Sequence, residues 1–186
     1  IGASAGGLEA LRDFVQAVSP GSGMCYVVVQ HLAPDHPSIM DQLLASHSKI
    51  PVVKIENGLR LEPDKVFVIP AGPELTISNG CFRLHEKPVE RGLRTPIDRL
   101  FHSMAEQVGR RAYCVVLSGT GSDGTAGLRA VKAAGGVAIA QGARSAKFSG
   151  MPENAAATGL VDFVLKPSQI PIRLQEIEAH RSFVEN

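Results

Sequence analysis

A chain of 186 residues has the length of one ordinary domain, and such a domain buries about 70% of the surface that its unfolded chain exposes. Its 19 Lys and Arg residues nearly balance 18 Asp and Glu residues, so no excess of positive charge favours binding to nucleic acid. The longest apolar run, 24–29, is far shorter than the roughly 20 residues of a membrane-crossing helix, and no segment resembles a signal peptide. We therefore expect a cytoplasmic protein without nucleic-acid partners or membrane insertion.

The cysteines and the first residue give two further expectations. Cys25, Cys81 and Cys114 are odd in number, far apart and flanked by apolar residues. This pattern indicates core thiols in a reducing cytosol rather than disulfides or metal ligands. Because the chain begins at Ile1 rather than at a methionine, we expect residues 1–186 to be one domain cut from a longer protein.

Short β-branched runs alternate along the chain with segments that have apolar residues at helical spacing. The predicted strands are 25–30, 52–55, 66–70, 113–117, 137–140 and 161–165, and the predicted helices are 8–18, 38–48, 96–108, 124–134 and 167–179. Most of these strands lack polar alternation, which is typical of strands buried on both faces. The order predicts a doubly wound α/β fold with a mostly parallel sheet and helices on both faces.

One segment interrupts this alternation. Asn79 and Gly80 lie between two extended runs in ELTISNGCFRLHE, and both residues tolerate the positive φ angles of a tight turn. The sequence therefore predicts an inserted β-hairpin.

Three polar residues follow predicted strands. Ser4 comes after a strand expected to end at Ile1, His31 follows 25–30, and Asp123 lies in the glycine-rich loop after 113–117. Ligands of an open parallel sheet bind at the carboxyl ends of the strands, beside the switch in strand order. One crevice could therefore hold all three side chains.

Together these residues are the set that acyl transfer requires. A serine hydroxyl becomes a nucleophile when an imidazole takes its proton, and a carboxylate orients that imidazole. Gly6 and Gly7 allow a sharp turn into the helix after Ser4, which places the hydroxyl near the positive end of the helix dipole. The loop 119–124 offers further backbone N–H groups for a developing oxyanion.

Each feature taken alone has a plainer interpretation. The GASAGG turn fits close packing or a phosphate, although it matches neither G-x-G-x-x-G nor the P-loop pattern. His31 could be a hydrogen-bonded structural residue, and Asp123 could cap the helix that follows it. A non-catalytic module that binds a phosphate-bearing ligand or a partner therefore stays open, as does a hydrolase of another ester or amide.

The other histidines and basic residues do not indicate a second catalytic site. The other histidines show no metal-ligand spacing, so we expect no metal and no cofactor. Lys87, Arg91 and Arg94 form a small basic cluster, which indicates a solvated loop or a docking site for an acidic partner.

The sequence contains, in this order, GASAGGLEAL, VVVQHLAP, VFVIPAGPELTI, TPIDRLFHSMAE, VVLSGTGSDGTAGLRAVKAAGG and FSGMPENAAATGLVDFVL. These segments resemble the catalytic domain of the chemotaxis protein-glutamate methylesterases, the CheB family. The resemblance extends from residue 1 to about residue 165, and several motifs in the right order make it specific.

The resemblance implies a cytoplasmic serine hydrolase that removes methyl groups from glutamate esters on chemoreceptor signalling helices, with release of methanol. Members of this family also deamidate certain receptor glutamines. The family's serine, histidine and aspartate correspond to Ser4, His31 and Asp123. Its oxyanion segment corresponds to the backbone of Thr120 and Gly121.

Two positions depart from the family pattern. Ala5 stands where the nucleophile turn usually has threonine, and Thr120 stands where the second loop often has methionine. A backbone N–H survives at both positions, so Ala5, Thr120 and Gly121 remain candidate oxyanion donors. These variants resemble esterase domains that are fused to a receptor methyltransferase, so a fused or separate methyltransferase is an expected partner. The resemblance covers the family's catalytic domain and not its receiver domain, so the family's mode of regulation is not implied.

Overall fold

A computed structural model describes residues 1–31, 39–86 and 94–185. Within them, a seven-stranded sheet has the order β3-β4-β2-β1-β7-β8-β9, and every neighbouring pair is parallel. Its strands are β1 (Gly2–Ala3), β2 (Cys25–Gln30), β3 (Val52–Lys54), β4 (Lys65–Val68), β7 (Tyr113–Val116), β8 (Val137–Gln141) and β9 (Phe163–Leu165). The sheet confirms the predicted doubly wound α/β fold.

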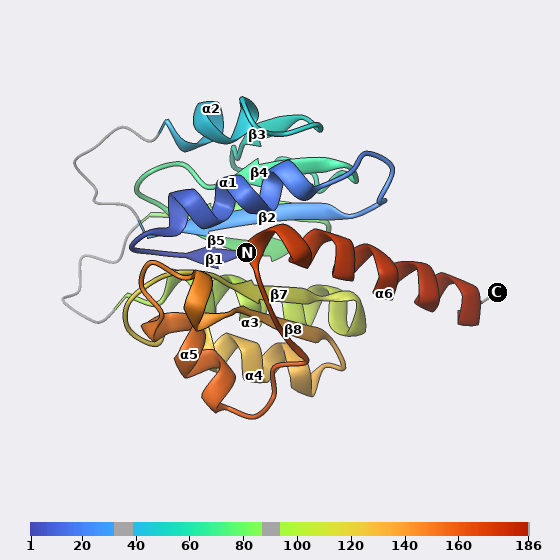
Figure 1. Ribbon diagram of the computed structural model, residues 1–186. Coiled ribbons are helices and arrows are strands. Elements are labelled where there is room, and N and C mark those ends of the chain that lie inside the picture. The colour runs from blue at the N-terminus through green and yellow to red at the C-terminus, as the bar shows by residue number, and fades with distance from the viewer. Residues whose placement is uncertain (32–38, 87–93, 186) are drawn as a thin grey trace.

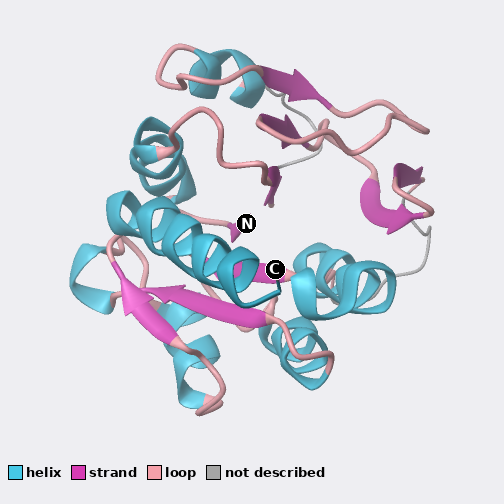
Figure 2. Cartoon of the chain, turned by 90° about the vertical axis from the view of Figure 1, so that its right-hand side faces the viewer, coloured by secondary structure: helices cyan, strands magenta, loops and turns pink. Residues whose placement is uncertain are grey.

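Helices cover both faces of this sheet (Figures 1 and 2). They are α1 (Gly7–Ala17), α2 (Met40–Ala45), α3 (Pro96–Val108), α4 (Thr125–Ala133), α5 (Gly150–Ala157) and α6 (Ile170–Glu185), with short 3-10 turns η1 (Gly109–Arg111), η2 (Ala143–Ser145) and η3 (Pro167–Gln169). One core cluster packs α1, α2 and α6 against one face, and the other packs α3, α4 and α5 against the opposite face.

The strands supply side chains to both cores. Along β7, Val115 belongs to the first core cluster, whereas Cys114 and Val116 belong to the second. Successive side chains of a strand point to opposite faces, so a strand covered on both faces needs apolar residues at every position. This explains why the predicted strands lack polar alternation.

The predicted hairpin is confirmed. β5 (Glu74–Ser78) and β6 (Cys81–His85) pair antiparallel, and Asn79 and Gly80 join them with φ angles of 52° and 72°. The hairpin packs on α3, where the Ser103 hydroxyl accepts a hydrogen bond from the Ile77 N–H at 3.0 Å.

The structure corrects several element predictions and adds one helix. The first strand comprises Gly2–Ala3 and does not end at Ile1, because its short pairing with both neighbours needs no β-branched residue. Helix α5 was not predicted. Glycine and proline are typical of loops, and Gly150 and Pro152 lie in the first turn of α5, where proline is tolerated. The last helix begins at Ile170, after η3, and extends to Glu185. The predicted helix 38–48 is shorter, because α2 comprises only Met40–Ala45, and residue 38 lies outside the described residues.

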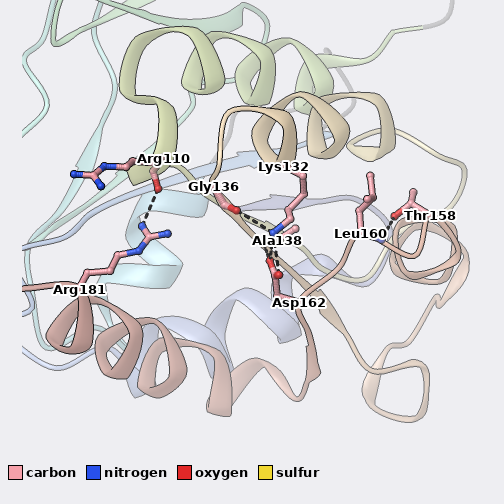
Figure 3. Close-up of polar contacts among 8 residues, drawn as sticks. All are labelled: Arg110, Lys132, Gly136, Ala138, Thr158, Leu160, Asp162 and Arg181. Carbon is pink, nitrogen blue, oxygen red and sulfur yellow. Dashed lines mark hydrogen bonds and ion pairs between the residues drawn. The ribbon is translucent and has the colours of Figure 1, made fainter. Parts of the chain in front are cut away.

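Polar contacts fasten the amino-terminal ends of the strands (Figure 3). The Asp162 carboxylate accepts the Ala138 N–H at the start of β8 and pairs with Lys132 at 2.8 Å. Arg181 of α6 donates to the Arg110 carbonyl at 2.7 Å. Because these contacts lie at the opposite end of the sheet from the predicted site residues, they can be altered without touching that site.

No helix in the described ranges is both long enough and apolar enough to span a membrane.

Candidate active site

The three predicted site residues follow three neighbouring strands. Ser4 comes directly after β1, His31 directly after β2, and Asp123 lies in the loop after β7. Strand β1 lies between β2 and β7, and the strand order reverses there, because the chain builds β2, β3 and β4 on one side before it returns to β7. The residues therefore lie at the switch point, where ligands of such sheets bind.

Ser4 is held in a tight turn between β1 and α1. Its N–H donates to the Ser118 carbonyl at 2.9 Å, and its carbonyl accepts the Gly7 N–H at 2.9 Å. Gly6 caps the helix with a φ of 68°, a conformation that glycine adopts without steric cost. Ser4 therefore lies just before the N-terminus of α1, which is the positive end of the helix dipole.

Replacing Gly6 with alanine should reduce the free energy of unfolding. The new Cβ would have to adopt a positive φ and would lie 2.8 Å from the Lys147 Cβ and 2.9 Å from the Ser118 Oγ. We expect a loss of about 2–4 kcal/mol, measured by urea unfolding.

Gly21→Ala is the matched control for Gly6→Ala. Gly21 also has a positive φ, of 81°, but nothing lies within 4 Å of an added Cβ. The free energy of unfolding of Gly21→Ala should therefore fall only by the cost of a positive φ in alanine, about 1 kcal/mol. Equal losses for the two variants would contradict the close packing described for Gly6.

His31 and Asp123 are in direct contact. His31 Nε2 lies 2.5 Å from Asp123 Oδ2. An ionised carboxylate can only accept, so Nε2 carries the proton in this contact, and Nδ1 is the ring nitrogen left to act as a base. The Asp123 side chain is 7% exposed and that of His31 is 32% exposed, so the carboxylate is shielded while the imidazole remains accessible.

Backbone N–H groups of α3 hold the Asp123 carboxylate. Oδ2 accepts the Ile97 N–H at 3.0 Å, and Oδ1 accepts the Asp98 N–H at 2.9 Å. Both donors lie in the first turn of α3, where the helix dipole stabilises negative charge. Asp123 therefore does not cap the helix that follows it, because the N-cap of α4 is Gly124, without a side-chain bond. It caps the neighbouring helix instead.

Ser4 lies on the neighbouring strand end but is not hydrogen-bonded to His31 within the described ranges. Its Cβ packs on the second glycine loop, since a Cβ added at Gly119 would lie 2.8 Å from it. The structure thus joins His31 to Asp123 directly, whereas Ser4 contacts the loop that carries Asp123.

Ser118 links the two glycine loops, and the sequence did not single it out. Its hydroxyl donates to the Ala5 carbonyl at 2.8 Å and accepts the Phe148 N–H at 3.0 Å, and its own N–H donates to Gln141 Oε1 at 2.8 Å. The residue is fully buried. Its position at the end of β7 was the only available signal, because partners so distant in sequence leave no local pattern.

The candidate oxyanion donors differ from the adjacent Gly119 in hydrogen bonding. The Gly119 N–H is occupied by the Phe148 carbonyl at 3.0 Å. The N–H groups of Ala5, Thr120 and Gly121 have no acceptor among the residues that the structure describes. Asn154 Nδ2 holds the Gly121 carbonyl at 2.8 Å, which fixes this part of the loop from α5.

Two other predictions concern residues away from this site. Lys87 and Arg91 of the basic cluster lie outside the described residues, and Arg94 is exposed, so docking of an acidic partner there stays a prediction. In the described ranges no three His, Cys, Asp or Glu side chains form a group suited to a metal ion. Cys25, Cys81 and Cys114 are free thiols, and burial raises the pKa of Cys25 and of Cys114 to about 12.

The fold and the position of the site define a doubly wound α/β protein with a polar residue set at its switch point. The family model described as CheB methylesterase matches residues 1–174. The chain therefore belongs to the CheB methylesterase family.

Known proteins support this membership. The chain is similar to the crystal structure of the Thermotoga maritima CheB methylesterase catalytic domain, with a TM-score of 0.84, 30% identity and 95% coverage of both chains. A protein-glutamate methylesterase/protein-glutamine glutaminase of Anaeromyxobacter dehalogenans is 36% identical over 95% of this chain and 52% of its own length. The Escherichia coli protein of that description is 35% identical over 91% of this chain and 50% of its own.

A 104.1 kDa protein of Rhodobacter capsulatus is 53% identical over 68% of this chain, which corresponds to 13% of that protein. The chain thus spans about half the length of the two methylesterases that it matches, and a much smaller part of this third relative.

Proposed function

We propose that this chain is a protein-glutamate methylesterase domain that hydrolyses glutamate γ-methyl esters on chemoreceptors and releases methanol. In this proposal Ser4 is the nucleophile, His31 the general base and Asp123 the group that orients His31. The observation that carries it is the 2.5 Å contact between His31 and Asp123, beside the strand end that presents Ser4.

The proposed reaction has two halves. His31 Nδ1 takes the proton of the Ser4 hydroxyl while Oγ attacks the ester carbonyl, and the same proton then passes to the departing methoxide, which leaves as methanol. Water attacks the resulting Ser4 ester, gives one proton to His31, and frees the glutamate carboxyl as the proton returns to Ser4 Oγ. In free enzymes the hydrogen bond between nucleophile and base is often long and forms fully only when substrate binds. The assignment is therefore consistent with a Ser4 hydroxyl that is not bonded to His31 among the described residues.

Asp123 stabilises the imidazolium that forms in each half. Its oxygens accept the two N–H groups of α3 and contact the His31 Nε2, which holds the carboxylate in place against the imidazole ring. The N–H groups of Ala5, Thr120 and Gly121 are the proposed oxyanion donors, and losing one such donor typically costs about 10²–10³ in rate.

The names of the relatives support the substrate class. A methyl ester and a primary amide of glutamate share the acyl carbon, so a site for one can also release ammonia from glutamine. We therefore propose methylated receptor helices in the cytoplasm as partners, with deamidation as a second activity. We also propose a receptor methyltransferase as a partner, either fused to this domain or separate. The matched region is only 13% of the Rhodobacter capsulatus relative, whose remaining length could accommodate a fused methyltransferase.

Methanol release from a receptor peptide that carries a glutamate γ-methyl ester tests this function. We expect the chain to release methanol from that peptide, and ammonia from its glutamine counterpart. Hydrolysis of a generic nitrophenyl ester without any methanol from the peptide would contradict the substrate and favour a hydrolase of another ester.

A further inference from the structure

We infer that Asp98 is a positioning residue for the proposed active site, acting through the Asp123 carboxylate on His31. The inference deepens the proposed function and rests on it for its kinetic readout. It comes from a reciprocal pair of contacts at the starts of α3 and α4. Asp98 of α3 accepts an N–H of the first turn of α4, and Asp123, just before α4, accepts N–H groups of the first turn of α3.

The two contacts share one residue. Asp123, just before α4, accepts the N–H groups of Ile97 and Asp98 in the first turn of α3. Asp98, in that same turn, accepts the Gly127 N–H in the first turn of α4 through Oδ1 at 2.7 Å. Because Asp98 is a donor to Asp123 and an acceptor from α4, any shift of Asp98 disturbs both helix starts and the carboxylate that contacts His31.

The two helices touch at this point without an intervening side chain. A Cβ added at Gly127 would lie 2.5 Å from the Phe101 Cβ and 2.9 Å from the Asp98 carbonyl oxygen. Glycine is therefore required there for α4 to approach α3 closely enough for the Asp98 bond. This contact fixes the distance between the two helix starts.

The arrangement has an electrostatic cost. Burial and then the nearby Asp123 charge raise the pKa of Asp98, which is 9% exposed, while the Gly127 N–H and the His102 side chain on the next turn of α3 oppose that rise. Two neighbouring carboxylates repel each other. An apolar residue at position 98 would avoid this repulsion but would leave the Gly127 N–H unpaired, so the side-chain oxygen at this position is explained by the bond that it accepts.

The test compares Asp98→Ala, Asp98→Asn and a matched control, Ser103→Ala. Asparagine keeps an oxygen that can accept the Gly127 N–H, whereas alanine does not. Ser103 lies on the same helix and also accepts a buried backbone N–H, that of Ile77, but on the face that packs on the hairpin. Ser103→Ala therefore removes a comparable contact without touching the Asp123 carboxylate.

The first readout is the rate at which a fluorophosphonate labels Ser4. We expect Asp98→Ala to lower this rate by about 10²-fold, the size of effect that a displacement of about 1 Å produces at a reacting centre. Asp98→Asn should retain most of the wild-type rate, and Ser103→Ala should leave it unchanged. Equal rates for Asp98→Ala and the wild type, or an equal fall in Ser103→Ala, would overturn the inference.

The second readout does not depend on activity. In a Ser4→Ala background, the proton shared by His31 Nε2 and Asp123 Oδ2 should give a far-downfield proton NMR signal. Asp98→Ala should remove or broaden this signal, and Asp98→Asn and Ser103→Ala should keep it. A signal that persists unchanged in Asp98→Ala would overturn the positioning role, whereas a protein that shows these NMR changes but never labels at Ser4 would contradict only the proposed function.

Gly127→Ala keeps the test decisive if Asp98→Ala does not fold. It should force the two helix starts apart without removing a charge, and it should lower labelling and broaden the same signal. A folded Gly127→Ala protein with wild-type labelling and an unchanged signal would overturn the inference.

Discussion

Replacing Ser4 with alanine should lower methanol release by about 10⁶-fold, the loss found when the nucleophile of a serine hydrolase is removed. Only the hydroxyl disappears: the backbone bonds of Ser4 to Ser118 and Gly7 do not involve the side chain. The fold should therefore survive, and turnover of the methyl-ester peptide together with thermal unfolding checks both statements.

Ser46→Ala is the matched control for Ser4→Ala. It also removes one serine hydroxyl, which is exposed and donates to the Leu43 carbonyl at 2.8 Å on α2. We expect wild-type methanol release from this variant. Full activity in Ser4→Ala would exclude Ser4 as the nucleophile, whatever the control shows.

Asp123→Asn should lower turnover by about 10⁴-fold, following the precedent of serine proteases. The carboxylate has two oxygens, and three N–H groups donate to them, those of His31, Ile97 and Asp98. An asparagine has one oxygen and an NH₂ group, so it must either lose helix N–H bonds or donate to His31. In the second case His31 would hold its proton on Nδ1, the nitrogen that must accept the Ser4 proton. Initial rates on the methyl-ester peptide measure the effect.

Asp162→Asn is the matched control for Asp123→Asn. Asp162 also accepts a backbone N–H, that of Ala138, and pairs with Lys132 at the opposite end of the strands (Figure 3). Its replacement should lower stability while turnover stays at the wild-type level. A fall of turnover in Asp162→Asn as large as in Asp123→Asn would show that the loss at Asp123 reflects stability rather than the proposed role.

Much of the fold could be predicted because its signals are periodic and local. Continuous apolar runs follow from burial on both faces, and Asn79-Gly80 follows from the positive φ angles of a tight turn. Strand β1 was misplaced because it consists of two small residues: Gly2 and Ala3 pair with β2, and Gly2 also pairs with β7. Helix α5 was missed because glycine and proline in its first turn hide its start.

Part of the candidate site could be predicted for a topological reason. Residues that follow adjacent parallel strands lie at one edge of a sheet, so the sequence alone could predict that Ser4, His31 and Asp123 lie near one another. The contacts that hold these residues in place could not be predicted. Asp123 binds backbone N–H groups of α3, and Ser118 binds the Ala5 carbonyl, across long separations in sequence. Such contacts join side chains to backbone and leave no periodicity.

Fluorophosphonate labelling of the free protein tests the central claim most directly, because the reagent reacts only with an activated hydroxyl. The proposal predicts one adduct, located by mass spectrometry at Ser4 and absent from Ser4→Ala. A protein that is not labelled, or that carries the adduct on another residue, would contradict the Ser4 assignment, and absence of labelling would favour a module that binds a phosphate-bearing ligand instead.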